Sequence, residues 1–110
     1  MDKLIRAEDG RLMFKCPGCN GIHAVTEEIW EFNGDLEKPT IRPSILSKFT
    51  PSAEGIERKI CHSFVTEGRI RFLNDCTHSL AGKTVSLVDV SEENYNMELV
   101  EKLRGGPDHE

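Results

Sequence analysis

The feature that most constrains this chain is a pair of cysteines, Cys16 and Cys19, that encloses a Pro-Gly dipeptide. Two further cysteines, Cys61 and Cys76, lie far along the chain. A Cys-x-x-Cys turn lets two sulfur atoms converge, and a structural zinc site often takes its other ligands from a separate hairpin. The sequence therefore predicts a knuckle near residue 16 and a hairpin near residue 61 that meet at one metal ion.

The fourth ligand of this site stays open on spacing alone. We predict a bound zinc whose ligands come from one set: Cys16, Cys19, Cys61, Cys76 and His78. Either Cys76 or His78 completes the set, and His23 and His62 are the alternatives. Buried thiols or a redox dithiol are the competing interpretations, but no strand–helix pattern follows Cys19, as a thioredoxin-like motif would require.

Length and charge limit the class of protein. The chain has 110 residues and a formal net charge of -5, so we expect one small domain that is unsuited to gripping nucleic acid or an anionic membrane. Arg42 and the RIRF run at 69–72 are scattered basic residues, and no run of Lys or Arg alternates with aromatic residues as a stacking groove would require. No stretch resembles a signal peptide or a membrane span, so we expect a cytoplasmic protein.

Short runs of β-forming residues dominate the chain, separated by turn residues. They lie at 11–14, 22–26, 29–32, 44–49, 59–65, 69–73 and 83–88. We predict a mainly β (α+β) fold: a small antiparallel, zinc-stabilised core over about 11–88 and one C-terminal helix over about 91–104, with a frayed tail at 105–110. The polar segment 50–57 is expected to be a surface loop.

The register of one hairpin makes the metal prediction specific. With a turn at Glu67-Gly68, Val65 lies opposite Ile70 and Ser63 opposite Phe72, so that Cys61 and Cys76 point to one face. His62 then points to the other face. There it is either a surface residue, which spacing favours, or part of a second cluster with Leu73 and Asp75.

Four segments together resemble a family of short phage and prophage proteins whose members are often mislabelled "ammonia monooxygenase". They are KCPGC, WEFNGDLEKPTIRPSIL, CHSFVTEGRIRFLNDCTHSLAG and KTVSL, within residues 13–88. The resemblance implies a phage-type zinc-binding protein of the host cytoplasm and a link to bacterial ubiquitin-like conjugation genes. It implies no oxygenase, because such a site needs clustered His or carboxylate ligands with open positions. The tail after residue 91 departs from the family.

Three functions fit these observations. The first, which we predict, is a non-enzymatic domain that binds a host or defence protein through Trp30 or the helix over 91–104, with inhibition of that protein as one form of this function. The second is a zinc-dependent hydrolase or transferase in which His62, Asp75 or His78 transfers a proton. The third is an acidic mimic of DNA, although the charge is too balanced for strong mimicry. The LRGG sequence at 103–106 matches a ubiquitin-like tail, but a helix stop is the simpler interpretation.

Overall fold

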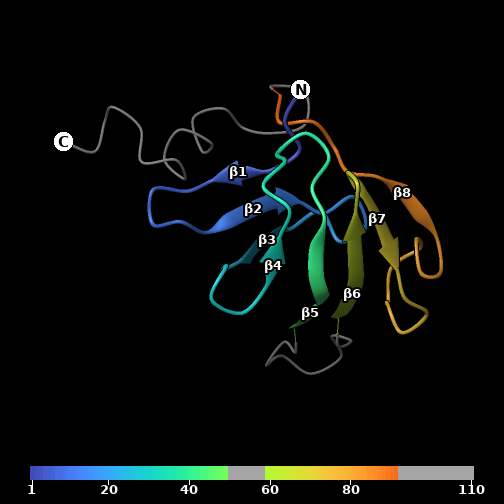
Figure 1. Cartoon of the computed structure of the whole chain (residues 1–110). Coiled ribbons are helices and arrows are strands. Elements are labelled where there is room, and N and C mark those ends of the chain that lie inside the picture. Colours follow the sequence, from blue (N-terminus) through green and yellow to red (C-terminus); the bar gives the residue numbers. More distant parts are fainter. Residues whose placement is uncertain (50–58, 92–110) are drawn as a thin grey trace.

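The computed structural model describes residues 1–49 and 59–91, and these residues form two antiparallel β-sheets (Figure 1). The smaller sheet has the order β1-β2-β3. Its strands are β1 (Ile5–Arg6), β2 (Leu12–Lys15) and β3 (Ile22–Val25). The turn that joins β2 to β3 contains Cys16 and Cys19, so the knuckle lies at one end of this sheet.

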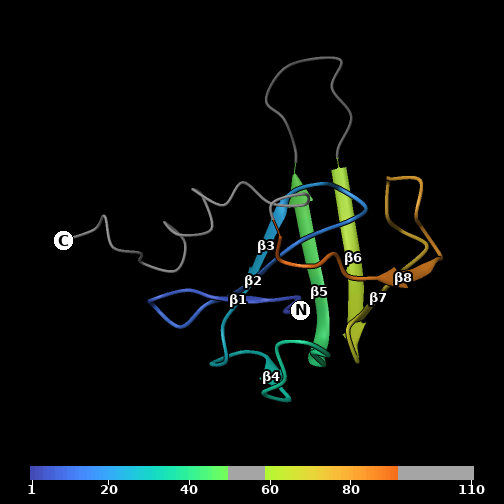
Figure 2. The ribbon, with the colours of Figure 1, turned by 90° about the horizontal axis from the view of Figure 1, so that it is seen from above.

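The larger sheet follows the chain in the order β4-β5-β6-β7-β8, with each strand antiparallel to its neighbours. Its strands are β4 (Glu31–Phe32), β5 (Ile41–Phe49), β6 (Lys59–Thr66), β7 (Arg69–Phe72) and β8 (Thr84–Ser86). The long strands β5 and β6 lie side by side in both views (Figure 2). Strands that follow one another in the sequence are neighbours in this sheet, so its topology is that of a meander.

The β6–β7 hairpin has the predicted register. Val65 pairs with Ile70 and Ser63 with Phe72. Glu67 and Gly68 both have positive φ, at 48° and 79°, which is the backbone of a tight two-residue hairpin turn. This register sets which residues of β6 face inward and which face outward.

The larger of two hydrophobic clusters joins the two sheets. Buried side chains from both sheets form it, including Leu12, Phe14, Val65, Ile70 and Phe72. Alternate residues of β6 and β7 are buried, as expected for strands with one face on the core. Burial of each large apolar side chain contributes roughly 1.5–3 kcal/mol, so this alternation fixes the orientation of the residues between them.

The prediction of a mainly antiparallel β protein is confirmed, and the described residues contain no helix. The predicted helix over 91–104, the LRGG sequence and the loop at 50–57 lie outside the described residues, apart from Ser91. Within the part of the chain that the structure describes, no helix has the length and apolar character of a membrane span.

Candidate functional site

Strand β6 carries candidate functional side chains on both of its faces. Cys61 is buried on the inner face, and the next residue, His62, is half-buried on the outer face. Because successive side chains of a strand point in opposite directions, a single β6 contributes one residue to each of two clusters. The inner cluster contains the cysteines, and the outer cluster contains hydroxyl, imidazole and carboxylate groups.

The inner cluster brings the knuckle and the hairpin together. Cys16, Cys19, His23 and Cys61 offer four ligand atoms that all lie within 4.8 Å of one another. The Sγ atoms of Cys16 and Cys61 are 3.6 Å apart, and Cys19 Sγ lies 3.3 Å from His23 Nε2. All four cysteines are free thiols. Three thiols and one imidazole at these distances form a donor set that could hold a metal ion.

The knuckle is a closed turn that aims its thiols at β6. The backbone N–H of Asn20 donates to the carbonyl of Cys16 at 2.9 Å, and the N–H of Cys16 donates to the carbonyl of Gly21 at 2.9 Å. Asn20 takes a positive φ of 61°, a conformation that asparagine tolerates better than most residues. The turn therefore reverses within a few residues and returns the chain to β3, which carries His23.

A hydrogen bond between two thiols of the inner cluster shifts their pKa values in opposite directions. The hydrogen bond between Cys16 and Cys61 holds the pKa of Cys16 well below its usual range and raises the pKa of Cys61. A thiolate is the form of cysteine that binds a metal ion. The arrangement thus favours the thiolate form of Cys16.

His78 lies against the knuckle with a fixed ring orientation. Its Nδ1 accepts a hydrogen bond from the N–H of Leu80 at 3.2 Å, and its ring meets Phe72 edge-on with the centroids 4.5 Å apart. An acceptor at Nδ1 places the proton of a neutral imidazole on Nε2. Nε2 lies 3.5 Å from Cys61 Sγ, so in this tautomer His78 donates a hydrogen bond to that sulfur. With Cys61 and Cys76, His78 also forms a second group of side chains that could hold a metal ion.

Cys76 is engaged with the backbone of β6. Its Sγ accepts from the N–H of His62 at 3.2 Å and donates to the carbonyl of the same residue at 3.2 Å. Donation to a carbonyl requires the protonated thiol, whereas a metal ligand must be a thiolate. Cys76 also lies within 4.8 Å of the ligand atoms of Cys61 and His78, yet its own contacts favour a hydrogen-bonding role.

The outer cluster is a linear array of three side chains. Ser44 Oγ lies 3.0 Å from His62 Nε2, and His62 Nδ1 lies 3.0 Å from Asp75 Oδ2. Both nitrogens of the imidazole are therefore engaged, one by a hydroxyl and the other by a carboxylate. With the proton on Nδ1, the ring donates to Asp75 and accepts from Ser44, which is the geometry that activates a serine nucleophile.

Local structure positions each of these three residues. The pairing of β5 with β6 is irregular between Ile41 and Ile45, and Ser44 lies in that bulge. Bulges often re-aim a side chain next to an active site. The indole N–H of Trp30 donates to the carbonyl of Ser44 at 3.3 Å, which fastens the bulge to the β3–β4 connection. Trp30 is partly buried against the core.

The segment that carries Asp75 runs along β6 and is tied to it. The N–H of Leu73 donates to the carbonyl of His62 at 2.9 Å, and the N–H of Thr77 donates to the carbonyl of Ile60 at 3.0 Å. The thiol of Cys76 adds its two bonds to His62 between these points. Backbone contacts before and after Asp75 therefore hold its side chain next to His62.

The sequence identified two of the three outer residues as candidates but favoured a surface role for His62. The structure instead places His62 in contact with Asp75 and Ser44. Ser44 was missed, because no GxSxG-type motif surrounds it and it lies 18 residues from His62 in sequence. Only the pairing of β5 with β6 brings them together.

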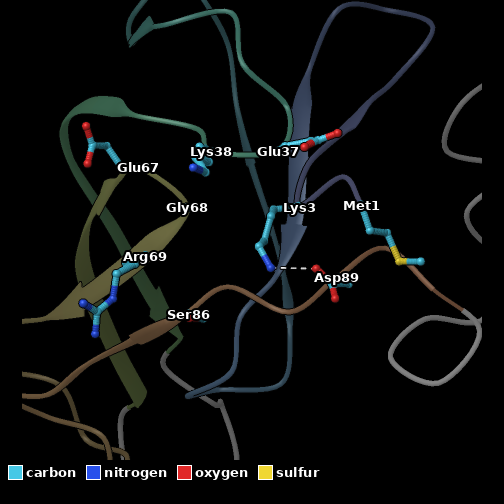
Figure 3. A pocket seen from close by; sticks show the side chains of 9 residues that line it. All are labelled: Met1, Lys3, Glu37, Lys38, Glu67, Gly68, Arg69, Ser86 and Asp89. Atoms are coloured by element: carbon cyan, nitrogen blue, oxygen red, sulfur yellow. Dashed lines mark hydrogen bonds and ion pairs between the residues drawn. The ribbon is translucent and has the colours of Figure 1, made fainter.

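A separate hollow of about 260 Å³ lies around the β6–β7 turn (Figure 3). An ion pair of 2.6 Å between Lys3 and Asp89 crosses it. Its lining residues are Met1, Lys3, Glu37, Lys38, Glu67, Gly68, Arg69, Ser86 and Asp89. None of the thiols and none of the three outer residues lines this hollow, so it is distinct from both clusters.

A Ser–His–Asp array in which both nitrogens of the imidazole are engaged is the arrangement found in serine hydrolases. Comparison with known families agrees with that class. The model of BubE, the bacterial ubiquitination-like system serine protease, matches residues 2–73, more than half of the chain, and the chain belongs to this family. The match includes Ser44 and His62 and ends two residues before Asp75. No curated protein and no solved structure matches the chain.

Proposed function

We propose that this chain is a serine protease of a bacterial ubiquitination-like system, with Ser44 as nucleophile, His62 as general base and Asp75 as the group that orients His62. The observation that carries the proposal is the pair of 3.0 Å contacts on the two nitrogens of His62. The family description supports the reaction class and the biological setting. The substrate is then a peptide or isopeptide bond in a protein of that system.

The geometry supports acyl transfer in two steps. Ser44 Oγ attacks the carbonyl carbon of the scissile bond while its proton passes to His62 Nε2. The C–N bond then breaks, and the leaving amine takes that proton from His62. In the second step His62 takes a proton from water, the hydroxide attacks the ester, and the proton returns to Ser44 as the carboxylic acid leaves. Asp75 stabilises the protonated imidazole throughout.

The inner cluster has a structural role in this proposal, with zinc as its metal and Cys16, Cys19, Cys61 and His23 as its ligands. A tetrahedral zinc with ordinary bond lengths places its sulfur atoms ~3.8 Å apart and sulfur and nitrogen ~3.6 Å apart. The contacts of 3.6 Å between Cys16 and Cys61 and of 3.3 Å between Cys19 and His23 are close to these values. Zinc held by four protein ligands stabilises the fold.

This ligand set differs from the one that we expected from sequence, in which Cys76 or His78 was fourth. His23 is favoured because its Nε2 already faces Cys19, whereas the contacts of Cys76 and His78 suit hydrogen-bond donors. The set also separates the metal from the reaction. Cys61 faces the core and His62 faces outward, so zinc supports the strand that carries the general base without touching the reacting atoms.

Labelling with a fluorophosphonate probe tests the catalytic assignment, because such probes modify only an activated serine. We expect labelling of one residue, Ser44, located by peptide mass spectrometry. Ser44→Ala and His62→Ala abolish the labelling. Ser47→Ala is the matched control, since Ser47 is exposed on the same strand but pairs with Cys61 rather than with His62. Absence of labelling in folded, zinc-loaded protein would favour the non-enzymatic binding protein expected from sequence.

A further inference from the structure

Strand β5 has one unpaired edge next to Ser44. On one side it pairs with β6 as far as Phe49, but on the other side β4 pairs only with Ile41 and Arg42. Among the described residues no strand adds to β5 beyond that point. The indole N–H of Trp30 donates a hydrogen bond to the carbonyl of Ser44, so the unpaired part of the β5 edge begins after Ser44.

The hydrogen bonds of β6 show which backbone groups face this open edge. The carbonyls of His62 and Ile60 accept bonds from Leu73 and Thr77, on the side of β6 away from β5. Their partners in β5, Leu46 and Lys48, are therefore in non-hydrogen-bonded pairs with β6. It follows that the N–H and C=O groups of Leu46 and Lys48 point outward, toward the open edge.

The same stretch is exposed at its side chains. Leu46 has 48% of its surface exposed, and its neighbours Ser47 and Lys48 are also exposed. A strand covered on one face would bury every second residue, so exposure of three consecutive residues shows that neither face of β5 is covered here. An exposed edge with unpaired backbone groups is a template for another strand.

We infer that this edge is the substrate-binding element: an extended segment of the substrate polypeptide adds to β5 as a strand opposite Leu46 and Lys48. The inference rests on the proposed protease function and names the kind of substrate that the site takes. Backbone hydrogen bonds to an open edge hold an extended chain with little regard to its side chains. The added strand ends at Trp30 and Ser44, where its scissile carbonyl meets the nucleophile.

This arrangement selects substrates by conformation. A segment in a helix or a paired strand has its backbone groups already bonded and cannot form the ladder. The favoured substrate is therefore an unstructured tail or linker, with the exposed side chain of Leu46 offering an apolar contact on the same face as His62. Folded domains are cut only where they present such a segment.

The test compares two substitutions at one position. Leu46→Ala removes the side chain alone, whereas Leu46→Pro also removes the N–H that faces the open edge, and proline is tolerated on edge strands. The substrate is acetyl-Leu-Arg-Gly-Gly-aminomethylcoumarin, because the chain's own residues 103–106 carry this sequence. We expect kcat/KM for Leu46→Pro to fall about two- to ten-fold below that of Leu46→Ala, the effect of one hydrogen bond. The rate of fluorophosphonate labelling stays equal in both variants.

A second measurement acts on the substrate, in case the proline variant does not fold. Methylation of one backbone nitrogen at a time removes one donor, and an added strand predicts losses in kcat/KM at alternate positions only. Equal losses at all positions, or no cleavage of any extended peptide by protein that is labelled at Ser44, overturn this inference and leave the protease assignment intact. Loss of labelling itself would overturn the protease assignment.

Discussion

Substitution of Gly18 tests the assignment of His78 as a hydrogen-bond donor to the thiol cluster. A Cβ atom at this position would lie 2.4 Å from Cε1 and 2.5 Å from Nε2 of His78, distances that real Cβ atoms do not show. In Gly18→Ala the ring must therefore move by ~1 Å to reach ordinary contact. That shift disrupts the contact of Nε2 with Cys61 and the bond from the Leu80 N–H.

The expected loss of stability follows from these two contacts. Each neutral hydrogen bond contributes about 1 kcal/mol net, which gives ~2 kcal/mol for the pair. Replacement of glycine by alanine at an ordinary backbone conformation stabilises a protein by roughly 0.4–1 kcal/mol through the unfolded state. The net decrease in the free energy of unfolding is then roughly 1–2 kcal/mol, or about 4–10 °C in Tm.

Urea unfolding of zinc-loaded protein measures this difference, with the metal content of each variant determined in parallel by elemental analysis. Gly21→Ala is the matched control from the same turn, because its Cβ would meet only Cys19 Sγ at an ordinary 3.7 Å. We expect Gly21→Ala to unfold like the parent protein and Gly18→Ala to retain its zinc. Gly18→Ala with unchanged stability would refute the reasoning, and loss of its zinc would show that His78 is a ligand.

Three further predictions concern the two clusters. His23→Ala lowers zinc affinity and the bound metal per chain in a chelator competition, whereas His78→Ala keeps the metal; the reverse result would exchange their roles. Cys76→Ala lowers kcat but leaves KM and metal content unchanged. Cys76→Ser restores kcat, because a hydroxyl can form hydrogen bonds with the same backbone groups of His62. Loss of zinc from Cys76→Ala would show that Cys76 is a metal ligand instead. Asp75→Asn lowers kcat by about 10⁴-fold, although it leaves the nucleophile Ser44 unchanged. If the pH-independent value of kcat were the same in Asp75→Asn and in the parent protein, Asp75 would not belong to the site.

The two clusters are connected through β6, which gives a physical reason for the proposed combination of a protease site with a structural metal. Cys61 and His62 are adjacent on β6, and Cys76 follows Asp75 in the segment tied to that strand. A small domain buries too little apolar surface to hold a catalytic array rigidly by packing alone. A metal ion bound on the inner face of β6 would fix the strand whose outer face carries the general base.

The sequence by itself determined the local features of this protein. The Cys-x-x-Cys turn, the Glu67-Gly68 hairpin and the alternation along β6 depend on neighbours in the chain, so spacing and turn chemistry were enough to predict them. Alternation also predicted that Cys61 and His62 face opposite sides. These features imply a β domain with a thiol cluster, and they make Asp75 a candidate partner of His62.

Only the tertiary structure pointed to Ser44 as the proposed nucleophile and to His23 as the favoured fourth metal ligand. Ser44 reaches His62 because a bulge displaces the register of β5 against β6, and a bulge leaves no periodic signal in the sequence. His23 approaches Cys61 because the smaller sheet packs on the larger one, a contact between residues far apart in the chain. The hydrogen bonds of Cys76 and His78 then favour donor roles for these two residues, and spacing carries no information on the direction of a ring nitrogen or a thiol proton.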